Sequence, residues 1–297
     1  MQKGQTTRKL WSVFFPEAIG IWGHEKERID ELRSRRFVQV TEINNQPIAD
    51  PEKEILFTSS VLLTLPAKSK PLDELPLSSS LKGEIQRILQ EPQQYWYDHP
   101  IQMGVEADQN EVLYGLRGLE RAYAFERQSG KAPADTKLRC VLSLAVTHPG
   151  LQGIAKRYLQ EELERAGGFT NLDVYVFTEV DTRKIITDVL APAARELLNA
   201  EDANDTLSFF GVDGEYSRHY SFLKAIATFW NVFVDPQLKA TFKIDLDQVF
   251  PQGVLVDETG SSALEHFFLT KTQTLAQKAA FRGVNVVTLF TNGNLSI

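Results

Sequence analysis

The spacing of apolar residues differs between the first 95 residues and the rest of the chain. In the first part, apolar and polar positions alternate at 37–43, and a longer apolar run at 55–65 predicts a second strand. Prolines and a run of serines then separate this strand from a short helix predicted at 81–89. We interpret residues 1–95 as an N-terminal extension or packing layer.

Residues 96–297 alternate between helical and strand patterns. Asp108, with a glutamate three positions later, resembles a capping box and opens a helix predicted at 109–128. Buried-strand runs follow at 139–147 and 172–178, and an amphipathic helix follows each of them. Helices between apolar strands are typical of parallel sheets. The sequence therefore predicts an α/β fold with a mostly parallel central sheet flanked by helices.

Polar residues stand at the carboxyl ends of the two strands predicted in this part. Thr147 and His148 follow the first strand, and Glu179 and Asp181 follow the second. Ligands of parallel sheets bind outside the carboxyl ends of the strands, so these side chains are candidate ligand contacts. A structural role in a turn is the ordinary alternative for His148.

Asp245 and Asp247 form the sharpest motif, because they are separated by one residue directly after an apolar run. In extended backbone such residues face the same side, and two carboxylates at a strand end suit Mg²⁺ or Mn²⁺. We therefore expect both side chains to face one cleft. The same spacing also occurs by chance in exposed turns. A helix predicted at 217–230 precedes the motif and carries Arg218 in its first turn.

The order of these motifs resembles the family 2-like glycosyltransferases of the GT-A fold. VLSLAVTHPG is similar to the first strand of the family's nucleotide-binding half, and VFTEVDTRK to its second, acid-ended strand. Ser217-Arg218-His219 is similar to the family's Arg-containing helix start, and KIDLD to its D-x-D motif. The resemblance covers about residues 138–250. It implies a Rossmann-like sheet and transfer of a sugar from a nucleotide-diphospho-sugar to an unknown acceptor.

The resemblance also implies roles for individual residues around the donor and a bound Mn²⁺ or Mg²⁺. It implies that Thr147 and His148 lie near the nucleotide and that Glu179 and Asp181 contact its base or ribose. It implies that Arg218 lies near the nucleotide or its phosphates. It also implies that Asp245 contacts the ribose or the metal's water and that Asp247 ligates the metal. Such a metal bridges diphosphate oxygens and stabilises the leaving nucleoside diphosphate.

The C-terminal part departs from the family pattern. Only 50 residues follow Asp247 (297 minus 247), where the family carries an acceptor-binding half. We therefore expect a short or truncated acceptor half. Asp257, Glu258 and Glu265 are weak candidates for a catalytic base, and His266 is a candidate for a further metal ligand or a helix-face histidine.

Three other functions remain open. A catalytically inactive GT-A-like module that binds a nucleotide or a partner fits the short C-terminus. A haloacid-dehalogenase-like phosphatase also carries a D-x-D-x-[TV] motif, but near the start of its core domain. A sugar nucleotidyltransferase needs a glycine-rich basic loop after its first strand, and THPGLQG matches such a loop poorly.

The charge and composition of the chain favour some classes of partner over others. A net charge of -7 and a pI near 5.4 disfavour nucleic acid, while a bound metal compensates for the charge of a nucleotide. The single cysteine, Cys140, excludes an internal disulfide and fits a cytoplasmic protein. No apolar run approaches 18 residues, so we expect no transmembrane segment, whereas peripheral contact with a membrane stays open.

Overall fold

The computed structural model describes residues 24, 26, 27, 48, 50–95, 99–213, 218–265 and 286–288. The chain divides into two compact units, Met1–Ile43 and Asn44–Ile297, and the elements below lie in the second. The strands are β1 (Ile55–Thr64), β2 (Ile101–Gln102), β3 (Leu138–Val146), β4 (Leu172–Thr178), β5 (Ala240–Lys243) and β6 (Val286–Thr288).

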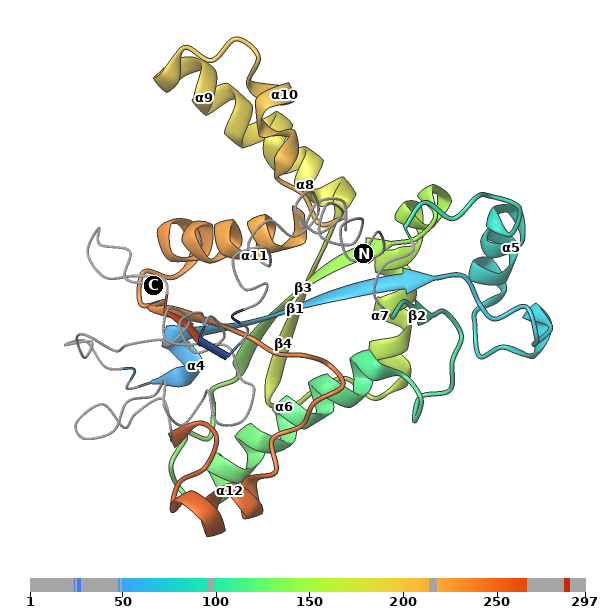
Figure 1. The fold of residues 1–297 in the computed structure, drawn as a ribbon. Coiled ribbons are helices and arrows are strands. Elements are labelled where there is room, and N and C mark those ends of the chain that lie inside the picture. Colours follow the sequence, from blue (N-terminus) through green and yellow to red (C-terminus); the bar gives the residue numbers. More distant parts are fainter. Residues whose placement is uncertain are drawn as a thin grey trace. The chain divides into compact units, whose positions relative to one another are not determined.

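Helices connect these strands (Figure 1). The α-helices are α4 (Pro51–Glu54), α5 (Ser79–Ile88), α6 (Glu111–Gln128), α7 (Ala155–Arg165), α8 (Glu179–Ile185), α9 (Ala191–Leu198), α10 (Ala203–Thr206), α11 (Arg218–Phe229) and α12 (Gln252–Thr259). Short 3-10 or π segments lie at Leu72–Glu74, Pro149–Gly153, Ile186–Leu190, Leu207–Phe209 and Trp230–Val234.

The described strands form one six-stranded sheet with the order β4-β3-β1-β5-β6, and β2 pairs with the end of β1. All pairings are parallel except that of β5 with β6. Helices pack on both faces of this sheet. The predicted α/β fold with a mostly parallel, helix-flanked sheet is therefore confirmed.

β1 is the central strand of the sheet, although it precedes the predicted boundary at residue 95. It pairs with β3 over Leu56–Leu63 on one edge and with β5 over Ile55–Thr58 on the other. The predicted division into 1–95 and 96–297 therefore does not follow the sheet. Periodicity alone did not show that the apolar run at 55–65 joins the later strands, because pairing between distant strands leaves no local pattern. The strand predicted at 37–43 lies outside the described residues.

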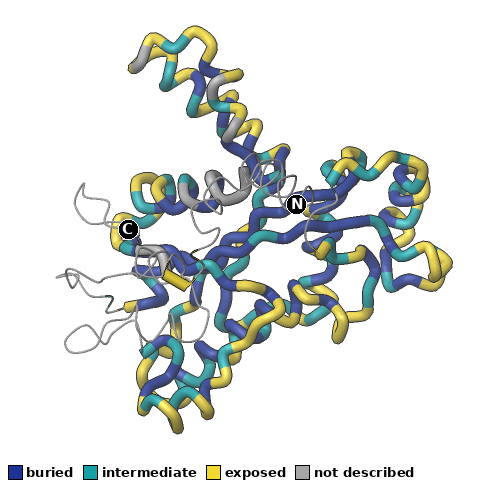
Figure 2. Tube along the Cα trace, in the orientation of Figure 1, coloured by how far each residue is buried: buried dark blue, intermediate teal, exposed yellow. Residues whose placement is uncertain are grey.

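The two faces of the sheet bury separate apolar cores. Alternate residues of β1 and β3, such as Phe57 and Leu142, join α5, α6 and α7 in the first core. The residues of the same strands that point to the other face, such as Leu56 and Val141, join α11 and the segment from α8 to Val212 in the second core. Figure 2 shows the buried residues concentrated along the central strands and on the inward sides of these helices.

Helix ends follow local chemistry, with one difference from the sequence-based expectation. α6 is capped by Asn110, whose side-chain oxygen accepts hydrogen bonds from the N–H groups of Val112 and Leu113, and not by Asp108. Gly167 and Gly168 have positive φ and follow the end of α7. Among the described helices, none combines the length and apolar character that crossing a membrane requires.

Candidate functional site

The strand order creates a topological switch point between β1 and β5. From β1 to β3 and on to β4, the connecting helices α6 and α7 pack in the first core. From β4 the chain crosses to β5 through helices of the second core. Neighbouring strands whose connections leave on opposite faces open a crevice outside their carboxyl ends, where ligands of such sheets bind.

The edge of β1 is open at this switch point. β5 pairs with β1 only up to Thr58, and β2 pairs with it again at Leu63 and Thr64. In the described chain, no strand pairs with residues 59–62 of this edge. The Ile244 N–H donates to the Thr58 carbonyl, and the Ser59 hydroxyl donates to the Ile244 carbonyl at 2.8 Å. The chain therefore leaves the sheet after Ile244, immediately before the D-x-D motif.

Asp245 and Asp247 lie in a turn and not in extended backbone. The Gln248 N–H donates to the Asp245 carbonyl at 3.1 Å, which closes the turn. The strand itself ends at Lys243, whose ammonium pairs with the Asp245 carboxylate. The premise that an extended strand end holds both carboxylates on one side is therefore wrong, because the backbone turns within the motif.

The buried residue between the two acids anchors this turn. Leu246 packs so closely against α6 that a Cβ on Gly115 would lie 2.6 Å from its Cα and carbonyl oxygen. One turn further along α6, a Cβ on Gly118 would lie 2.9 Å from the Val249 side chain. Asp247 is exposed and makes no hydrogen bond or ion pair within the described chain. α6 thus fixes the turn and leaves a carboxylate free beside the switch point.

The residues present suit a metal that retains water and phosphate ligands. Among described residues, no three His, Cys, Asp or Glu side chains gather as a metal-holding group. Mg²⁺ usually binds through one or two carboxylates and completes its coordination with water and substrate phosphates. Asp247, with or without Asp245, fits that mode and does not fit a site made only of protein ligands.

Hydroxylic side chains occupy the carboxyl half of the sheet on its α11 face. Ser60 of β1 is opposite Ser143 of β3, and alternation places Thr64 and Thr147 on the same face. The Thr147 hydroxyl donates to Thr64 Oγ1 at 2.7 Å, and the Ser60 hydroxyl is buried without a hydrogen-bond partner in the described chain. Buried hydroxyls in place of aliphatic side chains mark this half of the sheet as polar.

Ser60 and Thr64 were not predicted as site residues, because their strand was interpreted as part of an extension. The signal that could have found them is the Thr-Ser-Ser run at 58–60 inside an otherwise apolar strand. Polar residues within a buried strand need partners or a ligand. Their place beside the predicted Thr147 extends the candidate site onto β1.

His148 lies at the end of β3 and is buried, with 7% of its surface exposed. Its Nδ1 is 2.8 Å from the Thr147 hydroxyl. Burial lowers the pKa of His148, and the nearby Glu91 carboxylate opposes that shift. Glu91 in turn accepts a hydrogen bond from the Gly150 N–H at 2.8 Å. The structure thus places Thr147 and His148 together at the carboxyl edge, as the sequence predicted.

Glu179 and Asp181 have structural partners at the end of β4. One oxygen of the buried Glu179 accepts hydrogen bonds from the N–H groups of Val212 and Asp213. Asp181 forms a capping box with Thr178 and an ion pair with Lys156. Burial raises the pKa of Asp181, but the Thr178 hydrogen bonds and the Lys156 ammonium outweigh it, so the pKa is lowered. Both acids hold the loops of this edge in place.

The remaining predicted residues lie in the last third of the chain. Arg218 is the first residue of α11, as predicted. Asp257 and Glu258 are exposed on α12. Glu265 pairs with Lys131 and accepts a hydrogen bond from the Ser262 N–H. His266 lies outside the described residues.

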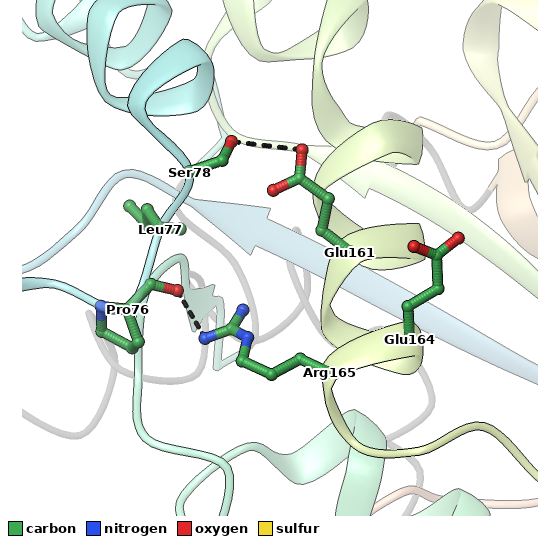
Figure 3. Close-up of a pocket in the computed structure, with 6 residues that line it drawn as sticks. All are labelled: Pro76, Leu77, Ser78, Glu161, Glu164 and Arg165. Atoms are coloured by element: carbon green, nitrogen blue, oxygen red, sulfur yellow. Dashed lines mark hydrogen bonds between the residues drawn. The ribbon is translucent and has the colours of Figure 1, made fainter.

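Away from the switch point, a hollow of about 450 Å³ lies between the start of α5 and the end of α7 (Figure 3). Pro76, Leu77, Ser78, Glu161, Glu164 and Arg165 line it. Ser78 donates to Glu161, and Arg165 donates to the Pro76 carbonyl, so these groups are bound to each other. We assign no function to this hollow.

Comparisons with protein-family models, with curated proteins and with solved structures found no match. The geometry of the sheet and its carboxyl edge therefore carries the functional argument.

Proposed function

We propose that the protein is a metal-dependent glycosyltransferase of the GT-A type, which transfers a sugar from a nucleotide-diphospho-sugar to an acceptor of unknown identity. One observation carries the proposal. The chain leaves a parallel sheet at its switch point through a D-x-D turn that exposes the Asp247 carboxylate, which has no partner among the described residues. This combines the edge where nucleotides bind with a hard oxygen ligand for their metal.

The strand order adds support. The resemblance assigns the first strand of the nucleotide-binding half to VLSLAVTHPG, but β1 precedes it and lies at the centre of the sheet. With β1 as the first strand, the D-x-D turn follows the strand that pairs beside it. We therefore propose that the nucleotide-sugar-binding domain includes β1 and its hydroxyl-bearing face, and that the extension is confined to residues before β1.

The site residues divide into donor contacts and supporting residues. We propose that Thr147, His148 and Arg218 lie around the nucleotide, and that Asp247 holds Mn²⁺ or Mg²⁺ with Asp245 at its second ligand position or at the ribose. Such a metal, when bound, neutralises charge on the diphosphate leaving group. The partners of Glu179 and Asp181 favour loop positioning over the base and ribose contacts that the resemblance implies.

Three acidic residues near the end of the described chain are candidates for a catalytic base on the acceptor side. Asp257 and Glu258 are exposed carboxylates on α12. The ion pair of Glu265 with Lys131 disfavours Glu265 as a base, because the paired carboxylate is stabilised in its ionised form. Burial raises the pKa of Glu265, but the Lys131 ammonium and the Ser262 N–H together outweigh burial, so the pKa is lowered. We propose a cytoplasmic setting from the lone buried cysteine.

A non-catalytic GT-A-like nucleotide-binding module is the second candidate, since an ion pair with Lys131 holds Glu265, one of the three candidates for a catalytic base. The phosphatase alternative is less favoured, because the five parallel strands β1 to β5 precede the D-x-D turn along the chain, whereas that family opens its core with the motif. The sugar nucleotidyltransferase alternative is also less favoured, because THPGLQG after β3 matches the glycine-rich basic loop of such an enzyme poorly. Release of sugar from a nucleotide sugar in the presence of Mn²⁺ separates the enzyme from the binding module.

The direct test of the metal ligand is Asp247→Asn. We expect the substitution to weaken binding of UDP or GDP in the presence of Mn²⁺ by about tenfold or more, because it removes a charged ligand while preserving volume. Isothermal titration calorimetry on both proteins measures the change. The matched control is Asp202→Asn, which alters an exposed acid whose side chain caps no helix. Unchanged affinity in Asp247→Asn would falsify the assignment.

A further inference from the structure

A chain of hydrogen bonds at the carboxyl edge fixes the protonation of one imidazole. The Thr147 hydroxyl donates its single proton to Thr64 Oγ1 at 2.7 Å. The same hydroxyl oxygen lies 2.8 Å from His148 Nδ1. Because Thr147 has no second proton, Nδ1 must be the donor in that contact. The neutral ring therefore carries its proton on Nδ1 and a lone pair on Nε2.

The environment keeps the ring neutral and leaves Nε2 available. His148 is about nine-tenths buried, and burial lowers its pKa despite the nearby Glu91 carboxylate. Glu91 is itself bound to the Gly150 N–H and makes no hydrogen bond to the imidazole within the described chain. Nε2 has no hydrogen-bond partner among the described residues. Nε2 is not one of the fully buried side-chain atoms that lack a partner, so it reaches the accessible edge, where a ligand that brings a donor can bind it.

We propose that His148 is a specificity-determining residue, whose Nε2 accepts a hydrogen bond from the ring N–H of a uracil or guanine base. This inference rests on the proposed function, because it assumes a nucleoside diphosphate at the carboxyl edge. Uracil presents N3–H and guanine presents N1–H on the pairing edge. Cytosine and adenine present a lone pair at the corresponding ring nitrogen, which repels the lone pair of Nε2.

Discrimination between bases follows from this difference. A donor–acceptor match at one edge of a base favours binding of the matched base over the mismatched base by about 1–3 kcal/mol. Such an energy corresponds to about tenfold or more in affinity. Thr147 acts as a positioning residue, because its hydroxyl selects the tautomer without touching the base.

The test measures the affinities of UDP, CDP, GDP and ADP by calorimetry with Mn²⁺ present. We expect the parent to bind UDP about tenfold or more tightly than CDP, and GDP more tightly than ADP by a similar factor. His148→Phe keeps a ring but has no acceptor, so both ratios should fall to within about twofold of unity. Thr147→Val should reduce the same ratios while retaining side-chain shape, and melting temperatures establish that each variant folds.

A pH series on the parent gives a readout that needs no variant. Protonation of His148 turns Nε2 from an acceptor into a donor. Because burial lowers the pKa of His148, this change is expected only well below the ordinary histidine pKa of about 6.5, where UDP should weaken relative to CDP, whose N3 then receives a hydrogen bond. Equal affinities for the four nucleotides, or ratios retained in His148→Phe, overturn the inference and leave the proposed function standing. If no nucleoside diphosphate binds with or without Mn²⁺, the proposed function fails together with it.

Discussion

At the scale of single residues, the fold buries one carboxyl group without a hydrogen-bond partner. Glu126 of α6 is 2% exposed, and neither of its oxygens has a partner in the described chain. Burial raises the pKa of Glu126, the nearby Glu265 adds to the rise, and Ser262 and Lys131 oppose it. A buried carboxyl group of this kind makes stability depend on pH.

Glu126→Gln tests that dependence. Below the ordinary pKa of a glutamate, the group is neutral in both the folded and unfolded states, so parent and variant should respond alike. As pH rises past that value, the unfolded chain releases the proton first, and the parent loses stability until the raised folded pKa is passed. Urea unfolding at about pH 4.5 and about pH 8 should therefore show the variant gaining stability relative to the parent at the higher pH. A pH-independent difference would contradict the assignment.

Residue roles were harder to predict than residue positions. Thr147, His148, Glu179 and Asp181 lie at the carboxyl ends of β3 and β4, as their order after apolar runs indicated. The partners of Glu179 include the backbone of Val212, more than 30 residues away in sequence, and no local pattern shows such a contact. The sequence could therefore place these residues at one edge but could not distinguish a ligand contact from a loop anchor.

At the scale of elements, α6 determines where the D-x-D turn lies. Gly115 allows the backbone of Leu246 to approach the helix, and Ala at this position would place Cβ 2.6 Å from Leu246. Gly115→Ala should lower the free energy of unfolding by about 1–3 kcal/mol, because the crowded backbone must move. It should also weaken Mn²⁺-dependent nucleotide binding, since the turn carries Asp247.

The control for this substitution is Gly83→Ala in α5. Gly83 is exposed and has no atom within 4 Å of an added Cβ. Alanine there should stabilise the helix by roughly 0.5–1 kcal/mol without affecting nucleotide binding. Chemical unfolding measures both variants. Equal stability changes at the two positions would argue against close packing of the turn on α6.

Element positions were largely predictable because each depends on local periodicity. β4 matches the predicted strand at 172–178, and β3 and α6 differ from prediction by one or two residues at their ends. The D-x-D segment was not predictable in the same way. Its turn depends on the fit of Leu246 against Gly115, residues that are more than 100 positions apart.

At the scale of the whole molecule, the order of the strands gives the site its position. The central position of β1 was not apparent from the sequence, because pairing with β3 and β5 joins segments separated by most of the domain. The alternation of helices and strands predicted the class of the fold, whereas the switch point required the strand order. The sequence therefore predicted separate strand ends, whereas their neighbours in the sheet became known only from the strand order.

We propose that the carboxyl edge of the sheet binds a nucleotide-diphospho-sugar through a divalent metal. The most direct measurement is a thermal-shift series on the full chain with UDP- and GDP-sugars, each with and without Mn²⁺. The account predicts that at least one sugar nucleotide stabilises the protein only when Mn²⁺ is present, by about 3 kcal/mol at a hundredfold excess over Kd. Stabilisation that is the same without the metal, or no stabilisation by any sugar nucleotide, would contradict it.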